Sequence, residues 1–276
     1  MTCFKKGKKF IFRVIVKNPL IRFFVDRNEH KLNSEADTLL YEQSEKGWSF
    51  VIVTDGKSDT YLTTQLASIY ENFLGKDNFE IIIVGSTKIS LKNNCKLIPY
   101  KDIKNFPGYI TLKKNIGVRN AKFDKVVITH DYVCLDKDWL KGFENISDDF
   151  DICVTKVNLK DGRRTRDWMV WDYPNIGQAL LPYEIKESSY NYFNGTYIIC
   201  NRDFFLQNPF NEHLRWGEAE DVEWSLRVRN NAKIILNTFS QVHYLKDKPA
   251  SDAPYCKNWI ENTEKIRKLL KVEYDY

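Results

Sequence analysis

Several features that would indicate other classes of protein are missing from this sequence of 276 residues. Glycine and proline are scarce, at 12 and 8 residues, which argues against a fibrous or disordered chain. The six cysteines show no Cys-x-x-Cys spacing, so they predict buried free thiols in a reducing compartment rather than disulfides or zinc ligands. No apolar run reaches the roughly 20 residues that a membrane-spanning helix needs. What remains is a globular protein, long enough to bury a substantial core.

Basic residues are concentrated at the N-terminus. The first 24 residues interleave Lys and Arg with Phe, Ile and Val, and contain no acidic residue. This composition suits a segment that lies on an anionic membrane surface, and equally a basic strand or helix packed on the domain. It is not typical of a signal peptide, because Arg13 and Lys17 interrupt the apolar run and no small-residue cleavage site follows. We therefore expect an N-terminal extension over residues 1–47.

Strand and helix patterns alternate beyond this extension. Residues 48–54 and 79–86 are short apolar runs typical of buried parallel strands, and apolar residues between them recur at helical spacing. A helical segment at 111–122 and a strand at 125–131 continue the alternation. This order predicts an α/β fold with a mostly parallel central sheet flanked by helices, in which ligands bind at the carboxyl ends of the strands.

The second half of the chain is less regular. Residues 160–190 combine arginines, tryptophans and turn formers without periodicity, so we expect a long functional loop there. Arg163, Arg164 and Arg166 in it could form a cationic clamp, or simply a solvated basic loop. The other expected elements are a short helix capped at Asp136, a strand at 151–159, a strand from Tyr190, a helix from Trp216, strands at 232–245, and a C-terminal helix within 251–276 that packs on the domain.

An aspartate follows the third predicted strand, in VVITHDYV. Asp131 could hold Mg²⁺ or Mn²⁺ against a diphosphate, because hard cations prefer oxygen ligands and share them with phosphates. On its own this pattern is more often a turn or a helix cap. His243, in FSQVHYL, could complete a coordination shell that one carboxylate leaves open, although a lone strand histidine is more often structural.

Acidic residues crowd the start of another predicted helix, in WGEAEDVEW. The helix dipole favours acids at this position, which is the structural explanation. The functional alternative is a carboxylate that takes the proton from an attacking hydroxyl group. Trp216 and Gly217, directly before the acids, would then provide an aromatic wall and a tight turn for an acceptor pocket.

The ordered series of these short motifs resembles the inverting family 2 glycosyltransferases of the GT-A fold, over about residues 48–245. Late WG-ED and histidine motifs of this kind are shared with galactosyl- and N-acetylgalactosaminyltransferases of the same fold. The series comprises K-N-x-G-x-x-x-A from Lys114 to Ala121, the strand ending at Asp131, the stretch from Asn194 and Gly195 to Arg202 and Phe205, WGEAEDVE from Trp216, and V-x-H ending at His243.

The resemblance implies a role for individual residues. Asp131 matches the last acid of the D-x-D motif that ligates the metal, and His243 matches a late histidine ligand. Asp221 matches the catalytic base, with Glu220 as its substitute. The positions matching nucleotide-sugar contacts are Asp55, Asn115, Arg119, His130, Asp131, Trp216 and Gly217.

Two positions depart from the family pattern. Thr129 stands where the first acid of D-x-D is expected, which leaves fewer carboxylates for the metal and makes His243 more important. Gly85 and Ser86 stand where the family has an acidic pair after the second strand. The second departure leaves the recognition of base and ribose unexplained.

The resemblance implies one GT-A domain at 48–250 that moves a sugar from a nucleotide-sugar donor, foremost a UDP-sugar, to a hydroxyl group. Inversion is favoured, the cofactor is Mn²⁺ or Mg²⁺, and nucleic acid is not a partner. The expected acceptor is a glycan or lipid-linked molecule in surface polysaccharide synthesis, in the cytoplasm or peripherally on the cytoplasmic membrane face.

Two other functions stay open. A sugar-nucleotide nucleotidyltransferase would carry a Gly-rich basic loop after the first strand, and TDGKSDTY matches this poorly. A non-catalytic sugar- or nucleic-acid-binding module of the same fold is favoured by Thr129. The retained Asp131, the acidic cluster and His243 argue against it.

Overall fold

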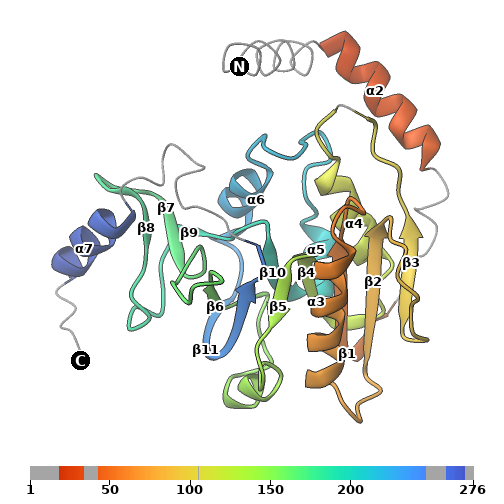
Figure 1. The fold of residues 1–276 in the computed structure, drawn as a ribbon. Coiled ribbons are helices and arrows are strands. Elements are labelled where there is room, and N and C mark those ends of the chain that lie inside the picture. The colour runs from red at the N-terminus through yellow and green to blue at the C-terminus, as the bar shows by residue number, and fades with distance from the viewer. Residues whose placement is uncertain (1–18, 34–42, 105, 247–258, 271–276) are drawn as a thin grey trace.

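The computed structural model describes residues 19–33, 43–104, 106–246 and 259–270. Figure 1 shows one α/β body with helix α2 at one end and α7 at the other. The elements are α2 (Pro19–Leu32), β1 (Glu45–Val53), α3 (Asp59–Asn72), β2 (Phe79–Gly85), β3 (Cys95–Pro99), α4 (Ile110–Arg119), β4 (Phe123–His130), β5 (Val133–Leu135), the 3₁₀ helix η2 (Lys141–Asn145), β6 (Ile152–Asn158), β7 (Met169–Tyr173), β8 (Gly177–Leu180), β9 (Asn191–Tyr192), β10 (Tyr197–Asn201), α5 (Arg202–Gln207), α6 (Glu220–Val228), β11 (Ile234–Tyr244) and α7 (Trp259–Leu270).

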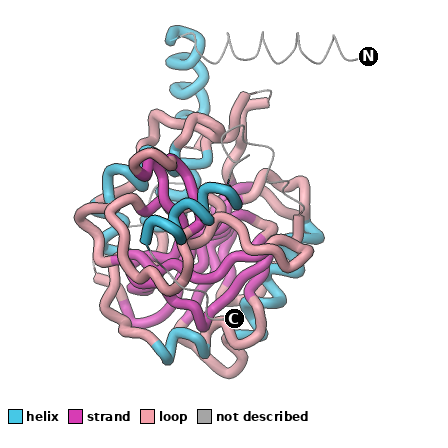
Figure 2. The backbone as a smooth tube through the Cα atoms, turned by 90° about the vertical axis from the view of Figure 1, so that its left-hand side faces the viewer, coloured by secondary structure: helices cyan, strands magenta, loops and turns pink. Residues whose placement is uncertain are grey.

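An eight-stranded sheet forms the centre of the molecule, in the order β3-β2-β1-β4-β10-β6-β11-β5. The first four strands run parallel to one another, as do β6 and β11, whereas β10 is antiparallel to both its neighbours. Figure 2 shows the strands in the middle of the body, with helices around them. The predicted α/β fold with a mostly parallel sheet flanked by helices is confirmed.

The register of the parallel strands brings three loop positions together. Val53 of β1 pairs with Val84 of β2 and with His130 of β4, so the strands end level with one another. The residues that end or follow these strands, Thr54, Gly85 and Asp131, therefore share one edge of the sheet. This is the carboxyl edge, where the alternating pattern predicted a ligand.

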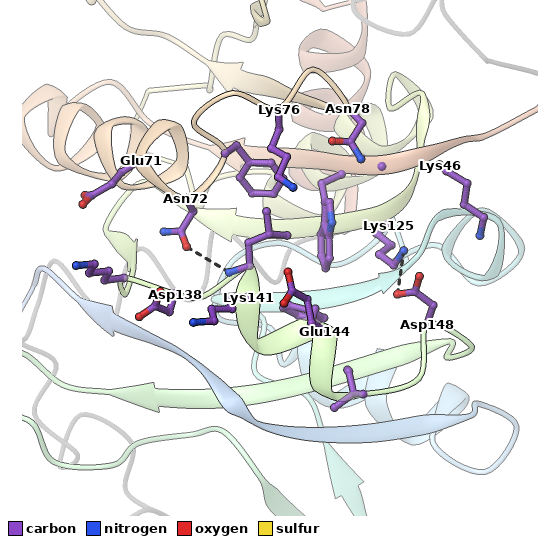
Figure 3. A pocket seen from close by; sticks show the side chains of 17 residues that line it. Lys46, Glu71, Asn72, Lys76, Asn78, Lys125, Asp138, Lys141, Glu144 and Asp148 are labelled. Carbon is purple, nitrogen blue, oxygen red and sulfur yellow. Dashed lines mark hydrogen bonds and ion pairs between the residues drawn. The ribbon is translucent and has the colours of Figure 1, made fainter.

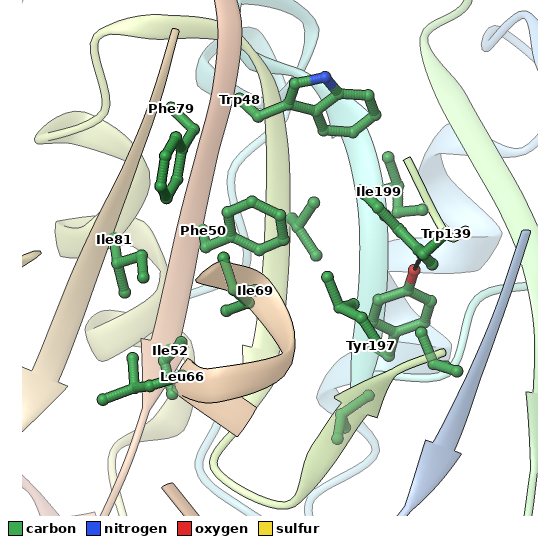
Figure 4. Close-up of a cluster of buried hydrophobic side chains, with 14 of the residues drawn as sticks. Trp48, Phe50, Ile52, Leu66, Ile69, Phe79, Ile81, Trp139, Tyr197 and Ile199 are labelled. Atoms are coloured by element: carbon green, nitrogen blue, oxygen red, sulfur yellow. Dashed lines mark hydrogen bonds between the residues drawn. The ribbon is translucent and has the colours of Figure 1, made fainter. Parts of the chain in front are cut away.

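Hydrophobic side chains fill both faces of the sheet. Phe50 and Ile52 of β1 pack with α3 and with Trp139 in one cluster (Figure 4), while Val51 between them faces a second cluster with α4 and α6. A Cβ atom on Gly117 would lie 2.1 Å from Val51 Cγ1, so only glycine lets α4 pack this closely on β1. The burial of these β-branched and aromatic side chains fixes where the strands end, and therefore where the carboxyl edge lies.

Several predicted elements differ from the structure. Residues 160–190 are not an irregular loop, because β7 and β8 lie within them and form a three-stranded sheet with β9. Asp136 does not cap a helix; the chain first makes turns and then the short η2. The strands expected at 232–245 are a single β11 with an irregularity between Asn237 and Gln241.

The terminal segments differ in how much of them the structure describes. α2 occupies part of the expected N-terminal extension, and β1 already begins at Glu45, inside that range. α7 packs on the small sheet, where Ile266 is buried and Asn262 donates to the carbonyls of Ile176 and Gln178.

Cys3 and Cys256 lie outside the described residues, whereas Cys95, Cys134, Cys153 and Cys200 are free thiols and buried. Within the described ranges, no helix combines the length and apolar character needed to cross a bilayer.

Candidate active site

Asp131 lies at the carboxyl edge and is almost completely buried. Its Oδ2 accepts a hydrogen bond of 2.6 Å from the Thr54 hydroxyl group across the sheet. Burial raises the pKa of Asp131, the Thr54 hydrogen bond opposes that rise, and the negative charge of Asp55 adds to it. A cation at this edge would therefore stabilise the ionised carboxylate.

Gly85 occupies a position where only glycine fits. Its φ is +143°, and a Cβ atom would lie 2.1 Å from the carbonyl oxygen of Thr54. Gly56 makes a similar close approach to Ser86, because a Cβ atom there would lie 2.3 Å from Ser86 Oγ. The loops after β1 and β2 are therefore in direct contact, which leaves no room at position 85 for the acidic side chain of the family pattern.

A partly buried ion pair borders the same edge and was not predicted. Lys113 Nζ in α4 is 2.5 Å from Asp102 Oδ2 and donates to the Thr54 carbonyl at 3.3 Å. Within the described part of the chain, Asp102 Oδ1 is buried without a hydrogen-bond partner. Asp102 lies in a loop without a motif, so the only local signal was the lysine before K-N-x-G.

Asp221 is the second residue of α6 and is held by three donors. Its Oδ2 accepts from the Tyr192 hydroxyl group at 2.5 Å and from the Gly195 amide at 3.1 Å, and Oδ1 accepts from the Val222 amide at 3.0 Å. These hydrogen bonds fix the carboxylate in one orientation. Such an orientation is what a general base needs.

A buried lysine lies beside this carboxylate. Lys114 is fully buried and donates 2.7 Å to the Gly195 carbonyl. Burial lowers its pKa, while the charges of Glu220 and Asp221 oppose that change. Burial raises the pKa of Glu220; the Lys114 charge opposes this and the Asp221 charge adds to it. The lysine thus offsets part of the negative charge at the start of α6.

One short segment connects the two aspartates. Tyr192 and Gly195 hold Asp221, while the Thr196 carbonyl accepts from the His130 amide, directly before Asp131. A Cβ atom on Gly195 would lie 2.9 Å from Asp221 Cβ, so glycine at this position leaves the room that Asp221 needs. The motif beginning at Asn194 therefore sets the relative position of the two acids.

The turn before α6 has an unusual backbone. Gly217 and Ala219 both have positive φ, at 82° and 62°, which costs energy for alanine but not for glycine. Trp216 is 63% exposed, and its amide donates to the Gly108 carbonyl. The exposed indole is available as the predicted aromatic wall, and its contact with an acceptor stays a prediction.

Two predicted nucleotide contacts on α4 already have protein partners. Asn115 is buried, exchanges hydrogen bonds with the backbone of Phe210 and donates to Glu212. Arg119 donates to the same Glu212 carboxylate at 3.1 Å. Both side chains hold the loop before the WG motif on α4, and a nucleotide contact by either stays a prediction.

The other predicted contacts lie at the carboxyl edge. Asp55 is exposed and accepts hydrogen bonds from the backbone and side chain of Lys57. Burial acts to raise the pKa of Asp55, but these hydrogen bonds outweigh burial, so the pKa is lowered. The ring of His130 packs edge-on against Tyr132, at 5.4 Å between centroids. Both residues therefore border Asp131, and a nucleotide contact by either stays a prediction.

His243 lies beside another aspartate than the one expected. Its Nδ1 is 2.5 Å from Asp136 Oδ1, and this hydrogen bond, followed by one with Cys134, raises the pKa of His243 to about 10. The register of β11 on β5 places His243 opposite Cys134, and Lys246 instead acts electrostatically on Asp131. The expectation that His243 is folded beside Asp131 is corrected by this pairing.

The fit of a metal to these residues is therefore partial. The register and the hydrogen bond place the His243 ring against Asp136 rather than Asp131, so the two residues expected to share a metal do not meet in this structure. Across the ranges that the structure describes, no three His, Cys, Asp or Glu residues are grouped to hold a metal ion. Asp131 can supply one carboxylate ligand, and the other ligands would have to come from outside this set.

The three loop arginines have different surroundings. Arg163 pairs with the exposed Asp161, and Arg164 pairs with the buried Asp167. The charge of Arg166 acts on Tyr132 and on Tyr192, which neighbour Asp131 and Asp221 respectively. Arg166 is thus the arginine of the expected clamp whose charge reaches both ends of the site.

A pocket of about 870 Å³ lies at the opposite end of the sheet. Lys46 and Trp48 at the start of β1, Asn78 before β2 and Lys125 in β4 line it (Figure 3). These residues belong to the amino ends of the parallel strands. The pocket is therefore separate from the carboxyl edge that carries Asp131.

Comparisons with known proteins identify the fold. No family model and no curated protein matches the sequence. Residues 1–349 of S. aureus TarS match with 16% identity and a TM-score of 0.51, over 72% of this chain and 60% of that one. Its complex with UDP-GlcNAc matches with 17% identity and a TM-score of 0.51, over 82% and 66%.

A third solved structure, GalNAc-T7 with UDP, GalNAc and Mn²⁺, matches with 16% identity and a TM-score of 0.51, over 91% of this chain and 58% of that one. This chain therefore spans about three fifths of the length of TarS 1–349 and of GalNAc-T7. The likeness shows that the chain has the GT-A glycosyltransferase fold, as the motif series predicted.

Proposed function

We propose that this chain is a glycosyltransferase that moves a sugar from a nucleotide-sugar donor to an acceptor hydroxyl group. The observation that carries the proposal is the arrangement around Asp221. The chain has a GT-A fold, and within it Tyr192 and Gly195 orient the Asp221 carboxylate. The segment that contains these two residues also contacts the edge with Asp131. A fixed base and an edge that can hold a cation against the leaving diphosphate are two parts that sugar transfer can use.

Asp221 is the proposed base, which takes the proton of the attacking hydroxyl group, with Glu220 as its substitute. Direct attack on the anomeric carbon with such a base favours inversion. Trp216 and Gly217 are proposed to border the acceptor. The exposed indole provides a flat apolar surface for a sugar ring.

A UDP-sugar is the proposed donor, since the similar structures of TarS and GalNAc-T7 hold UDP or UDP-GlcNAc. Asp55, His130 and Asp131 would face it at the carboxyl edge, with Asn115 and Arg119 as further proposed contacts. Arg166 and Lys246 would add positive charge near the diphosphate, because both act electrostatically on this region. This charge would favour departure of the nucleoside diphosphate.

A divalent metal, Mn²⁺ or Mg²⁺, bound at Asp131 would supply further positive charge for the leaving diphosphate. The remaining ligands are proposed to be diphosphate and water oxygens. The proposed setting is surface polysaccharide synthesis on a glycan or lipid-linked acceptor, in the cytoplasm or on the cytoplasmic face of the membrane.

The test is donor hydrolysis by the full chain. A panel of UDP-, GDP- and dTDP-sugars is incubated with Mn²⁺, and the released nucleotide is measured with and without EDTA. We expect hydrolysis of a UDP-sugar that EDTA abolishes and that Asp131→Ala reduces at least about hundredfold, as for loss of a main electrostatic group. Asp161→Ala, which alters an exposed carboxylate paired with Arg163, is the matched control and should not change the rate.

Other outcomes would replace this proposal. Donor binding without cleavage would favour the non-catalytic module. Release of pyrophosphate from a nucleoside triphosphate and a sugar phosphate would favour the nucleotidyltransferase. If no donor is bound or cleaved and Asp131→Ala changes nothing, the glycosyltransferase proposal is wrong.

A further inference from the structure

Helix α2 has two chemically different faces. Arg22, Asp26 and Glu29, spaced at helical intervals, face the domain. The opposite face carries Leu20, Phe23, Phe24, Arg27 and Lys31 at the same kind of spacing, and all five are exposed. The two acidic side chains of α2 therefore face the protein, while its outer face is apolar and basic.

The inner face is held by a buried ion-pair network. Arg215 Nη2 is 2.6 Å from Asp26 Oδ1 and 2.7 Å from Glu29 Oε2, and the Arg215 and Glu29 side chains are completely buried. Arg22 makes two hydrogen bonds to the Glu218 carboxylate, of 2.7 and 2.9 Å. This inner face fixes which side of the helix is exposed, because rotating α2 would leave buried charges unpaired.

The outer face is too apolar for an isolated surface helix. Leu20 is 71% exposed, and Phe23 and Phe24 are each 58% exposed and pack edge to face. Adjacent exposed aromatic rings indicate an interaction site rather than ordinary surface. Arg27 and Lys31 flank them, and the residues that precede α2 in the sequence add further bases without an acid.

We propose that the outer face of α2 docks on an anionic lipid bilayer. Apolar rings flanked by bases match the boundary between acyl chains and negative headgroups. The absence of an outward acid on α2 favours this occupant over a second copy of the chain, whose own basic face would be repelled. The docking is independent of donor chemistry, and only its purpose rests on the proposed function.

Docking would orient the site as well as tether it. Figure 1 shows α2 above the edge at which the parallel strands end. Through Arg22 and Arg215, the helix is joined to the turn that contains Trp216 and leads to Asp221. A docked α2 thus presents the acceptor side of the site to the bilayer surface, where a lipid-linked hydroxyl group would be within reach.

The test is vesicle binding by the full chain, with phosphatidylglycerol-containing vesicles compared with pure phosphatidylcholine. The wild type should bind the anionic vesicles at least about tenfold more tightly, since each nearby base adds to the attraction. The double variant Phe23→Ser, Phe24→Ser should lose about tenfold or more of this affinity through lost apolar burial. Leu74→Ser, at an 85% exposed leucine elsewhere, is the matched control and should bind as the wild type does.

A second variant tests the charges. Arg27→Glu with Lys31→Glu should remove most of the preference for anionic over neutral vesicles. Equal binding of the Phe23→Ser, Phe24→Ser variant and the wild type would overturn the proposal. So would equal binding of the wild type to both vesicle types, or self-association that the double variant abolishes.

Donor hydrolysis without vesicles separates this proposal from the enzymatic one. The Phe23→Ser, Phe24→Ser variant should hydrolyse donor at the wild-type rate and unfold at the wild-type temperature, because the changed side chains are exposed. A wild type that binds vesicles but cleaves no donor would support docking while contradicting the glycosyltransferase. The two proposals therefore fail separately.

Discussion

The two aspartates of the site are held in opposite ways. Asp221 begins a helix and accepts hydrogen bonds from Tyr192, Gly195 and its own neighbour Val222. Asp131 follows a strand, is buried, and accepts one side-chain hydrogen bond, from Thr54. A carboxylate with its acceptor sites occupied keeps one orientation, whereas a buried carboxylate with spare acceptor capacity favours a cationic ligand. This difference supports the proposed division of roles, with proton transfer at Asp221 and diphosphate binding at the Asp131 edge.

The largest expected effect comes from removing the charge of Asp221. Asp221→Asn should lower the rate of sugar transfer by about 10²- to 10⁴-fold, because a general base contributes about that much. Donor affinity, measured by calorimetry with the nucleotide sugar, should stay close to the wild-type value. Glu223→Gln, in the same helical turn but paired with Arg227, is the control. Loss of donor binding in Asp221→Asn would contradict the division between the two acids.

The next effect comes from crowding Asp221 without changing its charge. Gly195→Ala would place Cβ 2.9 Å from Asp221 Cβ and 3.2 Å from Lys114 Nζ. The acid must shift, so turnover should fall about tenfold or more, together with a loss of stability of about 1–3 kcal/mol. Both are measured on one preparation, by steady-state kinetics and thermal unfolding. Wild-type turnover in the folded variant would show that the orientation of Asp221 is unimportant.

Thr54→Val alters the Asp131 side instead. The valine cannot donate to Asp131, so the pKa of that carboxylate, already raised by burial, should rise further. Donor affinity should therefore be fewfold weaker at a pH where the carboxyl group is protonated in the variant and ionised in the wild type. When donor affinity is measured against pH, the pH below which it falls should therefore be higher for the variant than for the wild type. Thr54→Ser keeps the hydroxyl group and should restore the wild-type profile.

The smallest effect concerns His243. Its pKa is raised to about 10, so its ion pair with Asp136 stabilises the fold fully below the ordinary histidine pKa and is lost as pH rises through 10. Because the pair is partly exposed, its contribution is discounted to about 1 kcal/mol. Asp136→Asn should therefore lower Tm by about 2–4 °C at pH 6. The difference between variant and wild type should shrink towards pH 10.5.

His243→Gln also tests the corrected metal ligand. We expect the same Tm change as for Asp136→Asn, and an unchanged metal requirement for donor hydrolysis. If His243→Gln instead raises the metal concentration needed for half-maximal hydrolysis, the imidazole leaves Asp136 when donor binds. The metal site at Asp131 would then include His243, which this structure pairs with Asp136 instead.

The first half of the fold could be predicted from local patterns. β1, α3, β2, α4 and β4 each have an uninterrupted period of two or 3.6 residues, or a continuous apolar run. β3 was missed because CKLIP is short and mostly half-buried at the sheet edge. β7 and β8 were missed because their residues pair only with each other and with β9, which local periodicity does not reveal.

The site was predictable where one residue ends an element, and not where contacts cross the chain. Asp131 and Asp221 follow or begin regular elements, so their places could be inferred. Tyr192 and Thr54 contact them from distant segments and left no local signal. The partner of His243 depends on the register of β11 against β5, which a single sequence does not specify.

Arg215 also determines where this chain can be shortened. Its guanidinium is completely buried, and both of its carboxylate partners, Asp26 and Glu29, lie in α2. A chain beginning at residue 43 would keep every strand of the sheet but leave this cation without a counter-charge. Removing α2 would delete both ion pairs together with the packing that buries the guanidinium, so we expect a loss of stability. A shortened chain therefore has to keep α2 to retain these ion pairs, although the recognisable sequence pattern begins only at the first strand.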